Sequence, residues 1–348
     1  MPHFEVDELR DFARAALVGI GLDDAGAEVA AGCLVEANLR GVDSHGVLRL
    51  LQYHRSVSSG EVNPRPSVEV IRSAGPTALV DAGGGYGFVP ALRAMEVAVE
   101  LAGVHGIGLV GVRNSHHYGM AAPYAERATA AGLIGVAMTN TGPVMAPAGV
   151  TRPIVGNNPI ALAVPRRPPG AAIVLDMALS GTAFGRIRLA AAEGRPIPLG
   201  WAHDAAGEPT TDAAAALAAS LLAPMGGHKG YGLSVIVEVL TGILTGSPFG
   251  RESDAHRHLA GGVGHLFIVV RPDLFVEREV FEESVESWVR ELKSAPARPG
   301  AEVLLPGEVE QRTRAERLVT GVPVSDELLT QLNSFAHALG LASWLPAG

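Results

Sequence analysis

Two short segments of this sequence bring imidazole together with hydroxyl groups and glycine. In the first, residues 42–49, Ser44 stands beside His45, and Arg49 follows four residues later. In a helix that begins here, His45 and Arg49 would share one face, one turn apart. Arg49 could then hold a carboxylate through a forked pair of hydrogen bonds, and His45 could exchange a proton with the adjacent oxygen. This predicts chemistry on a small acid, at the carbon next to its carboxylate.

The same segment also has a plainer interpretation. Ser44 is a preferred residue at a helix N-terminus, and His45 and Arg49 would then lie on a solvated helix face. In the catalytic interpretation, Ser44 would orient the imidazole or contact the substrate. Local sequence leaves the two interpretations open.

The second segment, residues 114–119, reads Asn-Ser-His-His-Tyr-Gly. It follows an apolar strand expected over 107–112, and ligands commonly bind at strand ends. The side chains of His116 and His117 point in different directions, so one could serve a site while the other packs or is exposed. No carboxylate or further histidine nearby completes a set of metal ligands, so a metal site is not predicted.

Two further polar residues lie beside predicted strands. Asp176 ends the strand expected over 172–176, where it could handle a proton, bind a ribose hydroxyl, or cap a helix or turn. Asn157 lies in the Gly-Asn-Asn-Pro sequence of residues 156–159. Asparagine in such a sequence is a turn residue as readily as a ligand.

Three glycine-rich segments are candidates for phosphate-binding loops. Residues 106–111 match G-x-G-x-x-G, but a helix precedes them and a strand follows, which reverses the order that a dinucleotide fingerprint requires. Residues 83–87 miss the spacing of the fingerprint. Residues 226–232, with Lys229, open a predicted helix and could cradle a phosphate or form a flexible helix entry. The sequence therefore does not support a standard Rossmann fold, and a dinucleotide would bind in another way.

Composition excludes several classes of protein. A net charge of −9 argues against nucleic-acid binding, and the single cysteine, Cys33, rules out a disulfide framework and a Cys-ligated zinc site. The acidic N-terminus has no basic region of a signal peptide. The longest apolar stretch, residues 232–246, is too short to span a membrane and contains Glu238. A cytoplasmic protein that does not enter membranes is expected.

Hydrophobic periodicity predicts a mixed α/β protein of two domains with one substantial sheet. Two helices are expected within residues 5–37, and further helices over 47–57, 90–103, 120–131, 211–222, 229–245, 278–293, 312–317 and 325–340. Strands are expected over 68–71, 78–81, 107–112, 133–139, 160–164, 172–176 and 265–270. The Pro-rich connector at residues 63–66 precedes a domain boundary.

Taken together, these segments resemble the malate/L-lactate dehydrogenases of the second, non-Rossmann type. That family also contains ureidoglycolate, sulfolactate and diketogulonate dehydrogenases and reductases of cyclic imine carboxylates. The matching segments occur in order along nearly the whole chain, at residues 41–46 with Arg49, 114–119, 139–140, 156–159, 175–177, 197–201, 227–232 and 306–308.

The resemblance implies a nucleotide-binding and substrate domain, residues 73–304, built on a largely antiparallel sheet. It implies a helical domain made from both chain ends, residues 1–72 and 305–348. It further implies a homodimer with the site near the interface, a small carboxylate substrate, and NAD or NADP as the cofactor.

The resemblance also assigns roles to residues. His45 is the expected proton donor or acceptor, with Ser44 beside it and Arg49 on the substrate carboxylate. His117 matches a second active-site histidine, which in some relatives is assigned as the base. Asp176 is a further candidate for proton transfer, and Asn157 for substrate binding. The expected cofactor contacts are His116, Thr141, Asp176, Met177, Ala178, Lys229, Gly230, Pro306, Gly307 and Glu308.

The sequence departs from the family pattern at Val150, Asn157, Leu179 and Arg186. Leu179 and Arg186 are expected near the active site. These departures leave the reaction class standing and leave the substrate and the cofactor preference open.

The predicted function is hydride transfer between nicotinamide and C2 of a small 2-hydroxy or 2-oxo acid. The first alternative is reduction of a cyclic C=N, as in Δ1-piperideine-2-carboxylate or Δ1-pyrroline-2-carboxylate. A second is a non-catalytic carboxylate-binding protein, and a third is a hydrolase that uses no cofactor.

Overall fold

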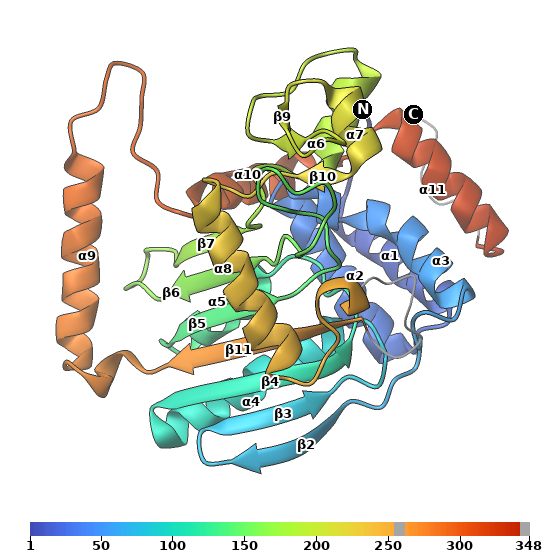
Figure 1. Ribbon diagram of the computed structural model, residues 1–348. Helices are drawn as coiled ribbons and strands as arrows, with labels where there is room; N and C mark the ends of the chain where they lie inside the picture. Colours follow the sequence, from blue (N-terminus) through green and yellow to red (C-terminus); the bar gives the residue numbers. More distant parts are fainter. Residues whose placement is uncertain (254–261, 342–348) are drawn as a thin grey trace.

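One large sheet carries helices on both faces and stands beside a helical lobe (Figure 1). This computed structural model describes residues 1–253 and 262–341. Within these ranges no helix has the length and apolar character to cross a membrane.

The large sheet has seven strands in the order β2-β3-β4-β11-β5-β6-β7. Neighbouring strands are antiparallel throughout, except that β3 and β4 are parallel. Its strands are β2 (Glu69–Ala74), β3 (Thr77–Asp81), β4 (Ile107–Ser115), β5 (Ile134–Thr139), β6 (Ile160–Val164), β7 (Ile173–Met177) and β11 (Val263–Val270). The predicted fold class, mixed α/β with a largely antiparallel, non-Rossmann sheet, is confirmed.

Helices cover the sheet according to the alternation of its side chains. Phe267 and Val269 of β11 pack in the cluster under α4 (Phe88–His105) and α5 (Ala122–Ala130). Leu266 belongs to the opposite cluster, which includes residues of α8 (His228–Glu238) and of the π-helical turn η3 (Val239–Ile243) that follows it. Successive strand residues point to opposite faces, so this sheet is buried on both sides.

The two ends of the chain form one helical lobe. Its core joins α1 (Val6–Ile20), α2 (Asp24–Leu39) and α3 (Leu50–Ser58) to α11 (Asp326–Ala338). Beside it, β1 (His3–Phe4) pairs with β12 (Val322–Pro323), and α10 (Glu308–Thr320) contacts α2. The helical domain from both chain ends is thus present, whereas the boundaries at residues 72, 73, 304 and 305 stay a prediction.

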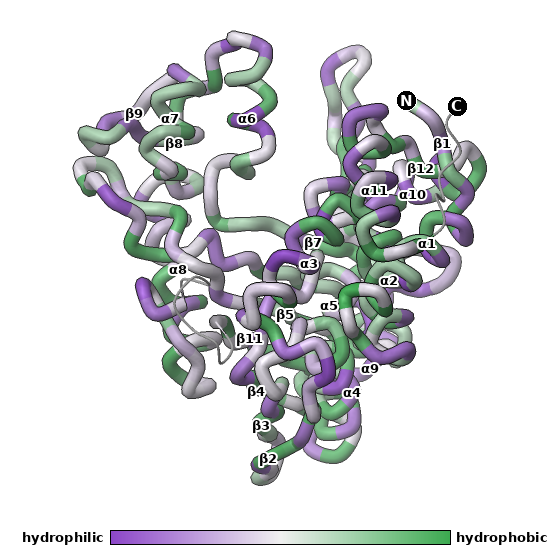
Figure 2. Tube along the Cα trace, turned by 90° about the vertical axis from the view of Figure 1, so that its right-hand side faces the viewer, coloured by the Kyte–Doolittle hydropathy of each residue, from purple (hydrophilic) through white to green (hydrophobic). Residues whose placement is uncertain are grey.

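A smaller lobe follows β7. It contains α6 (Phe184–Ala192), β8 (Ala202–His203), β9 (Pro209–Thr210), α7 (Ala213–Ala219) and β10 (Leu221–Leu222). In Figure 2 this lobe rises on one side of the molecule, and the helical lobe with α1, α10 and α11 stands on the other. Sequence patterns did not predict α6 or the short strands. The helix expected over 211–222 ends earlier, because Ser220 adopts a left-handed conformation and the chain then enters β10.

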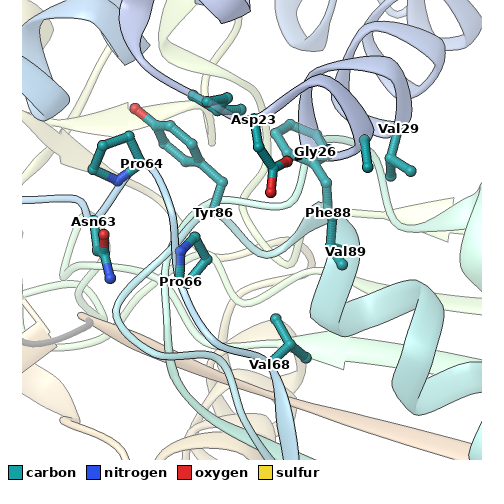
Figure 3. A pocket seen from close by; sticks show the side chains of 12 residues that line it. Asp23, Gly26, Val29, Asn63, Pro64, Pro66, Val68, Tyr86, Phe88 and Val89 are labelled. Atoms are coloured by element: carbon teal, nitrogen blue, oxygen red, sulfur yellow. Dashed lines mark hydrogen bonds between the residues drawn. The ribbon is translucent and has the colours of Figure 1, made fainter.

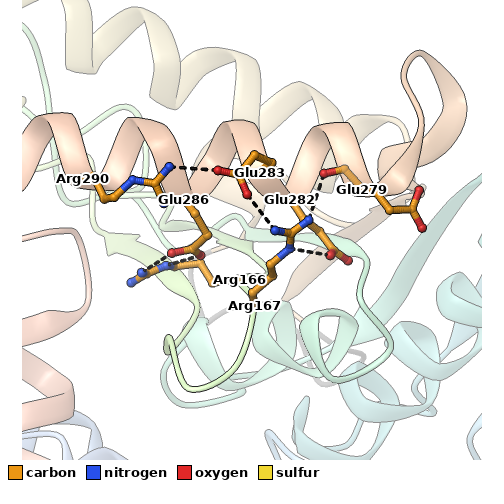
Figure 4. A network of polar contacts seen from close by, with 7 residues as sticks. All are labelled: Arg166, Arg167, Glu279, Glu282, Glu283, Glu286 and Arg290. Carbon is orange, nitrogen blue, oxygen red and sulfur yellow. Dashed lines mark hydrogen bonds and ion pairs between the residues drawn. The ribbon is translucent and has the colours of Figure 1, made fainter.

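Helix α9 (Arg278–Ser294) lies at the edge of the molecule and is tied to the loop after β6 by ion pairs (Figure 4). Arg166 donates two hydrogen bonds to the carboxylate of Glu286, at 3.0 and 2.8 Å. Arg167 pairs with Glu282 at 3.0 Å and with Glu283 at 2.8 Å. The forked geometry of the first pair, which is largely shielded from solvent, makes it the stronger attachment.

The G-x-G-x-x-G match is a packing motif. Helix α4 ends at Gly106, whose φ of +83° is left-handed, and β4 begins immediately afterwards. A Cβ atom at Gly108 would stand 2.0 Å from the carbonyl oxygen of Ala98 in α4. The glycine therefore lets helix and strand approach, and the expectation that these residues do not form a dinucleotide turn agrees with this order of elements.

Replacing Gly108 by alanine should destabilise the protein by about 1–3 kcal/mol, because the new methyl group overpacks backbone against backbone. Urea denaturation would measure this loss. Gly103→Ala in α4, the helix that Gly108 of β4 approaches, is the matched control, since a Cβ there meets nothing within 4 Å. That control should be neutral or stabilising, by up to about 1 kcal/mol. Equal stability of the two variants would refute the packing role.

Candidate active site

The segment around His45 is not a single helix. Two 3-10 turns, η1 (Asp43–His45) and η2 (Val47–Arg49), are separated by Gly46, whose backbone is extended. The expectation that His45 and Arg49 lie one turn apart on a continuous helix is therefore wrong, and the α-helix begins only with α3. The structure nevertheless keeps the two side chains close, since the charge of Arg49 acts on the imidazole of His45.

Asn38, a residue that sequence reasoning missed, explains the shape of this segment. It lies in α2 with 4% of its surface exposed. Its amide oxygen accepts from the Val47 amide at 2.9 Å, and its amide nitrogen donates to Asp43 at 2.6 Å. A Cβ at Gly46 would stand 2.1 Å from the Asn38 oxygen, so the glycine is required for this contact. The burial of Asn38 becomes apparent only in the folded structure, so the sequence offered no signal for this role.

The second attachment of this segment comes from the other end of the chain. Arg317 of α10 pairs with the carboxylate of Asp43 at 2.8 Å and also donates to the backbone oxygen of Asn38. The segment that carries His45 is therefore held between α2 and α10.

The two candidate imidazoles stack on each other. The ring centroids of His45 and His117 are 5.5 Å apart, with 17° between the planes. Burial, together with the positive charge of Arg49, lowers the pKa of His45 to about 4. The same two causes, with His45 itself and His265, hold the pKa of His117 well below its ordinary value. Both rings are therefore neutral at neutral pH, and they can exchange protons only if a ligand changes their surroundings.

Arg49 has no acidic partner among the described residues. Its Nε donates to the Ser44 carbonyl oxygen at 2.7 Å, and one terminal nitrogen donates to Gln52 at 2.6 Å. The hydroxyl of Ser44 lies 3.0 Å from Nδ1 of His45. A half-buried guanidinium whose bonds are all to neutral acceptors is available to an anion.

The glycine turn at residues 83–87 holds the second histidine segment. The amide of Gly84 donates to the Asn114 oxygen at 2.8 Å, and the amide of Gly87 donates to the His117 oxygen at 3.0 Å. The His116 amide donates back to Gly85 at 3.0 Å. This turn therefore positions histidines, and the suspicion that it is not a phosphate fingerprint fits its contacts.

His116 and His117 do point to different surroundings. His116 is 7% exposed, lies against Glu61 in the loop after α3, and has a pKa lowered by burial to about 4. His117 belongs with His45, as described above. A contact between His116 and a cofactor stays a prediction, and none of the contacts described for His116 supports it.

His265 of β11 is a further buried histidine that sequence reasoning did not select. Its two ring nitrogens lie 2.7 Å from the Thr139 hydroxyl and 2.8 Å from the Ser115 hydroxyl. Its ring stacks on Tyr118 with a centroid distance of 4.6 Å. This histidine joins β11 to its two neighbouring strands next to the histidine segment. A polar residue within an apolar strand was the sequence signal that could have identified it.

Asp176 lies in a pocket of about 390 Å³ together with Pro306, Gly307 and Arg40. Its carboxylate accepts from the Ala122 amide at 2.7 Å and so caps α5 from a different strand. The side chain is exposed at the mouth of the pocket, and loss of solvation beside the pocket walls raises its pKa to about 6, against the lowering effect of the backbone amides and of Arg40. The cap role and a ligand role are compatible, because a carboxylate can accept further hydrogen bonds.

The loop at residues 306–308 joins this pocket through the backbone. The Val174 amide of β7 donates to the Pro306 oxygen at 3.0 Å. A Cβ at Gly307 would come within 3.0 Å of the Val174 oxygen, so the loop lies flat on the strand. Glu308 forms an ion pair with Lys293 and accepts from the Leu305 amide, which gives it structural partners.

Thr141 and Asn157 form a second cluster of predicted residues. The Thr141 hydroxyl donates to the Asn157 side chain at 2.9 Å and accepts from the Asn157 amide at 3.1 Å. Next to them, the buried Asn158 accepts from the Thr141 amide and donates to Glu238 at 2.6 Å. Asn157 thus serves as a loop residue here, and its contact with substrate stays a prediction.

The remaining predicted cofactor contacts lie around two segments. Met177 and Ala178 directly follow Asp176 at the end of β7 and are half-buried. Lys229 is exposed in the first turn of α8, after Gly227 with its φ of +63°. A Cβ at Gly230 would stand 2.2 Å from the Met225 oxygen, which explains this glycine by packing.

The residues that depart from the family pattern have different surroundings. Leu179 is fully buried in the core of the small lobe, and its amide donates to the Asn157 oxygen at 2.8 Å. Arg186 is exposed on α6. Val150 lies in a loop, and its backbone amide donates to the backbone oxygen of Pro147.

A separate apolar cavity of about 170 Å³ lies behind the site (Figure 3). Tyr86 and Phe88 form one wall, and Pro64, Pro66 and Val68 are among its other lining residues. None of the predicted site residues lines this cavity. It therefore does not coincide with the candidate active site.

Comparison with known proteins gives a consistent picture. The model of a family described as malate/L-lactate dehydrogenase matches residues 4–333. A malate dehydrogenase of Pyrococcus abyssi is 37% identical, over 96% of this chain and 94% of that protein. A (2R)-3-sulfolactate dehydrogenase (NADP(+)) of Chromohalobacter salexigens is 38% identical, over 92% and 95%. A ureidoglycolate dehydrogenase (NAD(+)) of Escherichia coli O157:H7 is 32% identical, over 95% of each.

Solved structures agree. The sulfolactate dehydrogenase of Methanocaldococcus jannaschii superposes with a TM-score of 0.89 at 34% identity, covering 98% of each chain. The Δ1-piperideine-2-carboxylate reductase of Pseudomonas syringae superposes with a TM-score of 0.87 at 32% identity, covering 97% of this chain and 100% of the other.

Asp176→Asn should gain stability relative to the parent protein as the pH rises from 4.5 to 7.5. The carboxyl group has a higher pKa when folded, about 6, than its usual 3.8. Between these values the folded state binds more protons, so the parent loses stability with rising pH, and the amide does not. Urea denaturation at both pH values measures the difference.

Asp273→Asn is the control for this experiment. Its pairing with Arg271 lowers the pKa of Asp273, so that carboxylate is ionised in both states throughout this pH range. The stability difference between Asp273→Asn and the parent should therefore stay constant. A pH-independent difference for Asp176→Asn as well would contradict the raised pKa.

Proposed function

The chain belongs to the malate/L-lactate dehydrogenase family, and we propose that His45 carries the proton transfer of its reaction, with His117 as the second active-site histidine, while Arg49 binds the substrate carboxylate. The protein is an NAD(P)-dependent oxidoreductase that acts on small 2-hydroxy acids. The observation that carries the residue assignment is the half-buried Arg49, which stands beside two stacked neutral imidazoles without an acidic partner among the described residues.

Substrate binding raises the pKa of His45. Burial and, after it, the charge of Arg49 lower the pKa of His45, and a carboxylate bound to Arg49 neutralises the second of these causes. The pKa of His45 then rises toward the working pH, so the imidazole gains the ability to hold a proton in the complex. His45 accepts the proton of the substrate hydroxyl in the oxidation and returns it to the carbonyl oxygen in the reduction. Ser44 holds the ring through Nδ1.

The residues of the Asp176 pocket fit a nicotinamide dinucleotide. Asp176 offers its carboxylate to a ribose hydroxyl. Pro306 and Gly307 line the same pocket, and Met177, Ala178 and Glu308 are sequence neighbours of these residues. Lys229 and Gly230, at the N-terminus of α8, suit a phosphate, and Thr141 is a further proposed cofactor contact. When bound, the dinucleotide accepts or donates the hydride at C2 of the acid.

One assay distinguishes the proposed function from two alternative functions. The closeness to a Δ1-piperideine-2-carboxylate reductase keeps reduction of a cyclic imine as the second candidate. The purified protein should be given a panel of 2-oxo acids and cyclic imine acids with NADH and with NADPH. Alcohol products support the proposal, and amine products would favour the imine reductase. Ligand binding without nucleotide oxidation would identify a non-catalytic carboxylate-binding protein.

Arg49→Met should raise KM for the carboxylate substrate by at least about 30-fold, because it removes a charge-assisted pair worth roughly 2–5 kcal/mol. His45→Ala should instead lower kcat by about 10²–10⁴-fold. Steady-state kinetics of both variants separates the two roles. Arg72→Met, at an exposed arginine of β2, is the control and should change neither constant. An unchanged KM in Arg49→Met removes Arg49 from the site, and a loss below tenfold in His45→Ala transfers proton exchange to His117 or Asp176.

We also propose that the protein is a homodimer. The face of α8 and η3 that points away from the sheet carries large apolar side chains, of which Leu233, Ile236, Ile243 and Leu244 are 49–61% exposed. An apolar helix face of this kind suits a second copy of the chain, since a stable interface buries about 800 Å² per partner. A cytoplasmic location fits the need for NAD or NADP.

Ile236→Glu should convert the dimer to a monomer, because it places a charge in an apolar interface. Sedimentation velocity at micromolar concentration would show the change in mass. Val104→Glu, at a 77% exposed position of α4, is the control and should stay dimeric. A parent protein that sediments as a monomer would refute the proposal.

A further inference from the structure

The hydroxyl of Tyr53 is directed at the second imidazole of the site. Tyr53 belongs to α3, is 1% exposed, and places its hydroxyl oxygen 2.8 Å from Nδ1 of His117. The Gly119 amide also donates to Nδ1, at 3.2 Å. One ring nitrogen of His117 therefore has two partners. No described residue forms a hydrogen bond with the other nitrogen, Nε2.

The Gly119 amide decides the protonation state of Nδ1. A backbone N–H can only donate, so Nδ1 must present its lone pair. The proton of the neutral imidazole then sits on Nε2. Tyr53 must also donate to Nδ1, because that nitrogen has no proton to give. Both partners therefore favour the same tautomer of His117.

The surroundings of Tyr53 hold its hydroxyl in this position. The ring contacts Tyr86 at a centroid distance of 4.5 Å and Phe88 at 5.9 Å. The Tyr86 hydroxyl donates to the Tyr53 backbone oxygen at 2.9 Å. Figure 3 shows Tyr86 and Phe88 together among the residues that line the apolar cavity. Burial raises the pKa of Tyr53, so the phenol keeps the proton that it donates.

Gly119 is equally constrained. Its φ is +79°, a left-handed conformation that suits glycine, and a Cβ there would stand 3.1 Å from the Phe88 ring. This backbone conformation turns the Gly119 amide back toward His117, two residues earlier. The same aromatic cluster thus supports both donors.

We propose that Tyr53 is a positioning residue that, with the Gly119 amide, fixes His117 in the Nε2–H tautomer and presents Nε2–H as a neutral hydrogen-bond donor to the substrate. This inference rests on the proposed function for the identity of the ligand. The tautomer of His117 can be tested without measuring catalysis. The geometry differs from that of His45, whose Nδ1 partner is a serine hydroxyl that can donate or accept.

The charged and titratable groups that face His117 act in the same direction. His45 and Arg49 face it from η1 and η2, and His265 faces it from β11. A second proton on His117 would have to sit on Nδ1, directly against the Gly119 N–H. The Gly119 amide therefore resists protonation of His117, and the hydrogen bond that Tyr53 donates to the neutral ring acts in the same direction.

Tyr53→Phe keeps the packed ring and removes only the hydroxyl. Nitrogen NMR of 15N-histidine-labelled protein distinguishes protonated from unprotonated ring nitrogens. The parent should show Nε2–H for His117, and the variant a mixture of tautomers. In kinetics, kcat should fall about tenfold while KM changes less than about twofold. The acidic limb of the kcat/KM profile should move to higher pH by about 0.5–1 unit, because one donor to the neutral ring is gone.

Tyr86→Phe is the matched control, since it removes a hydroxyl from the same aromatic cluster without touching His117. It should lower thermal stability to a similar degree and leave the tautomer and the acidic limb unchanged. Nδ1–H in the parent, or equal pH profiles in both variants, would overturn the inference. If the parent does not oxidise NADH or NADPH with any acid, the proposed function fails, and the NMR comparison still decides the role of Tyr53.

Discussion

Backbone hydrogen bonds between the turn at residues 82–87 and the segment at 113–117 are the constraint on which the site depends. They hold His117 at the end of β4 and set Tyr86 and Phe88 against α3. Because β3 and β4 are parallel neighbours, the chain leaves both strands at the same edge of the sheet. The turn after one strand and the histidines after the other are thus brought side by side, and the Asp81 carboxylate reinforces this arrangement by accepting from Arg113 at 2.9 Å and from Asn114 at 3.1 Å. The glycines matter here because their amides must approach a neighbouring backbone.

The electrostatic character of the site follows from the charged and titratable side chains that have no oppositely charged partner among the described residues. Arg49 keeps its positive charge among neutral acceptors, and two imidazoles stay uncharged beside it. A negatively charged ligand is therefore the missing component of the charge balance, which agrees with the small acids of the family. The pocket that Asp176 lines contains none of these three residues, so the proposed anion-binding and nucleotide-binding parts are chemically distinct.

Much of the fold was predictable because it rests on periodicity. Strands β6 and β7 and helix α9 lie within a residue or two of their expected bounds, since the spacing of apolar residues specifies each of them. The break at Gly46 was not predictable, because it depends on Asn38, a residue eight positions away whose burial only the fold reveals. Residue types and spacing marked His45, Arg49 and His117 as candidates. Tyr53 and His265 escaped notice because their roles arise from contacts across 64 and 150 residues of sequence.

The helical lobe has a consequence for how the protein is made. Its core joins helices near the N-terminus to α11, and Arg317 completes the support of the His45 segment. Ribosomes add about 5–20 residues per second, so the first helices wait roughly 10–50 s for their C-terminal partners. During this interval their apolar faces lack a cover, and chaperones have a surface to bind. Competence for chemistry is consequently acquired only after α10 and α11 have been synthesised.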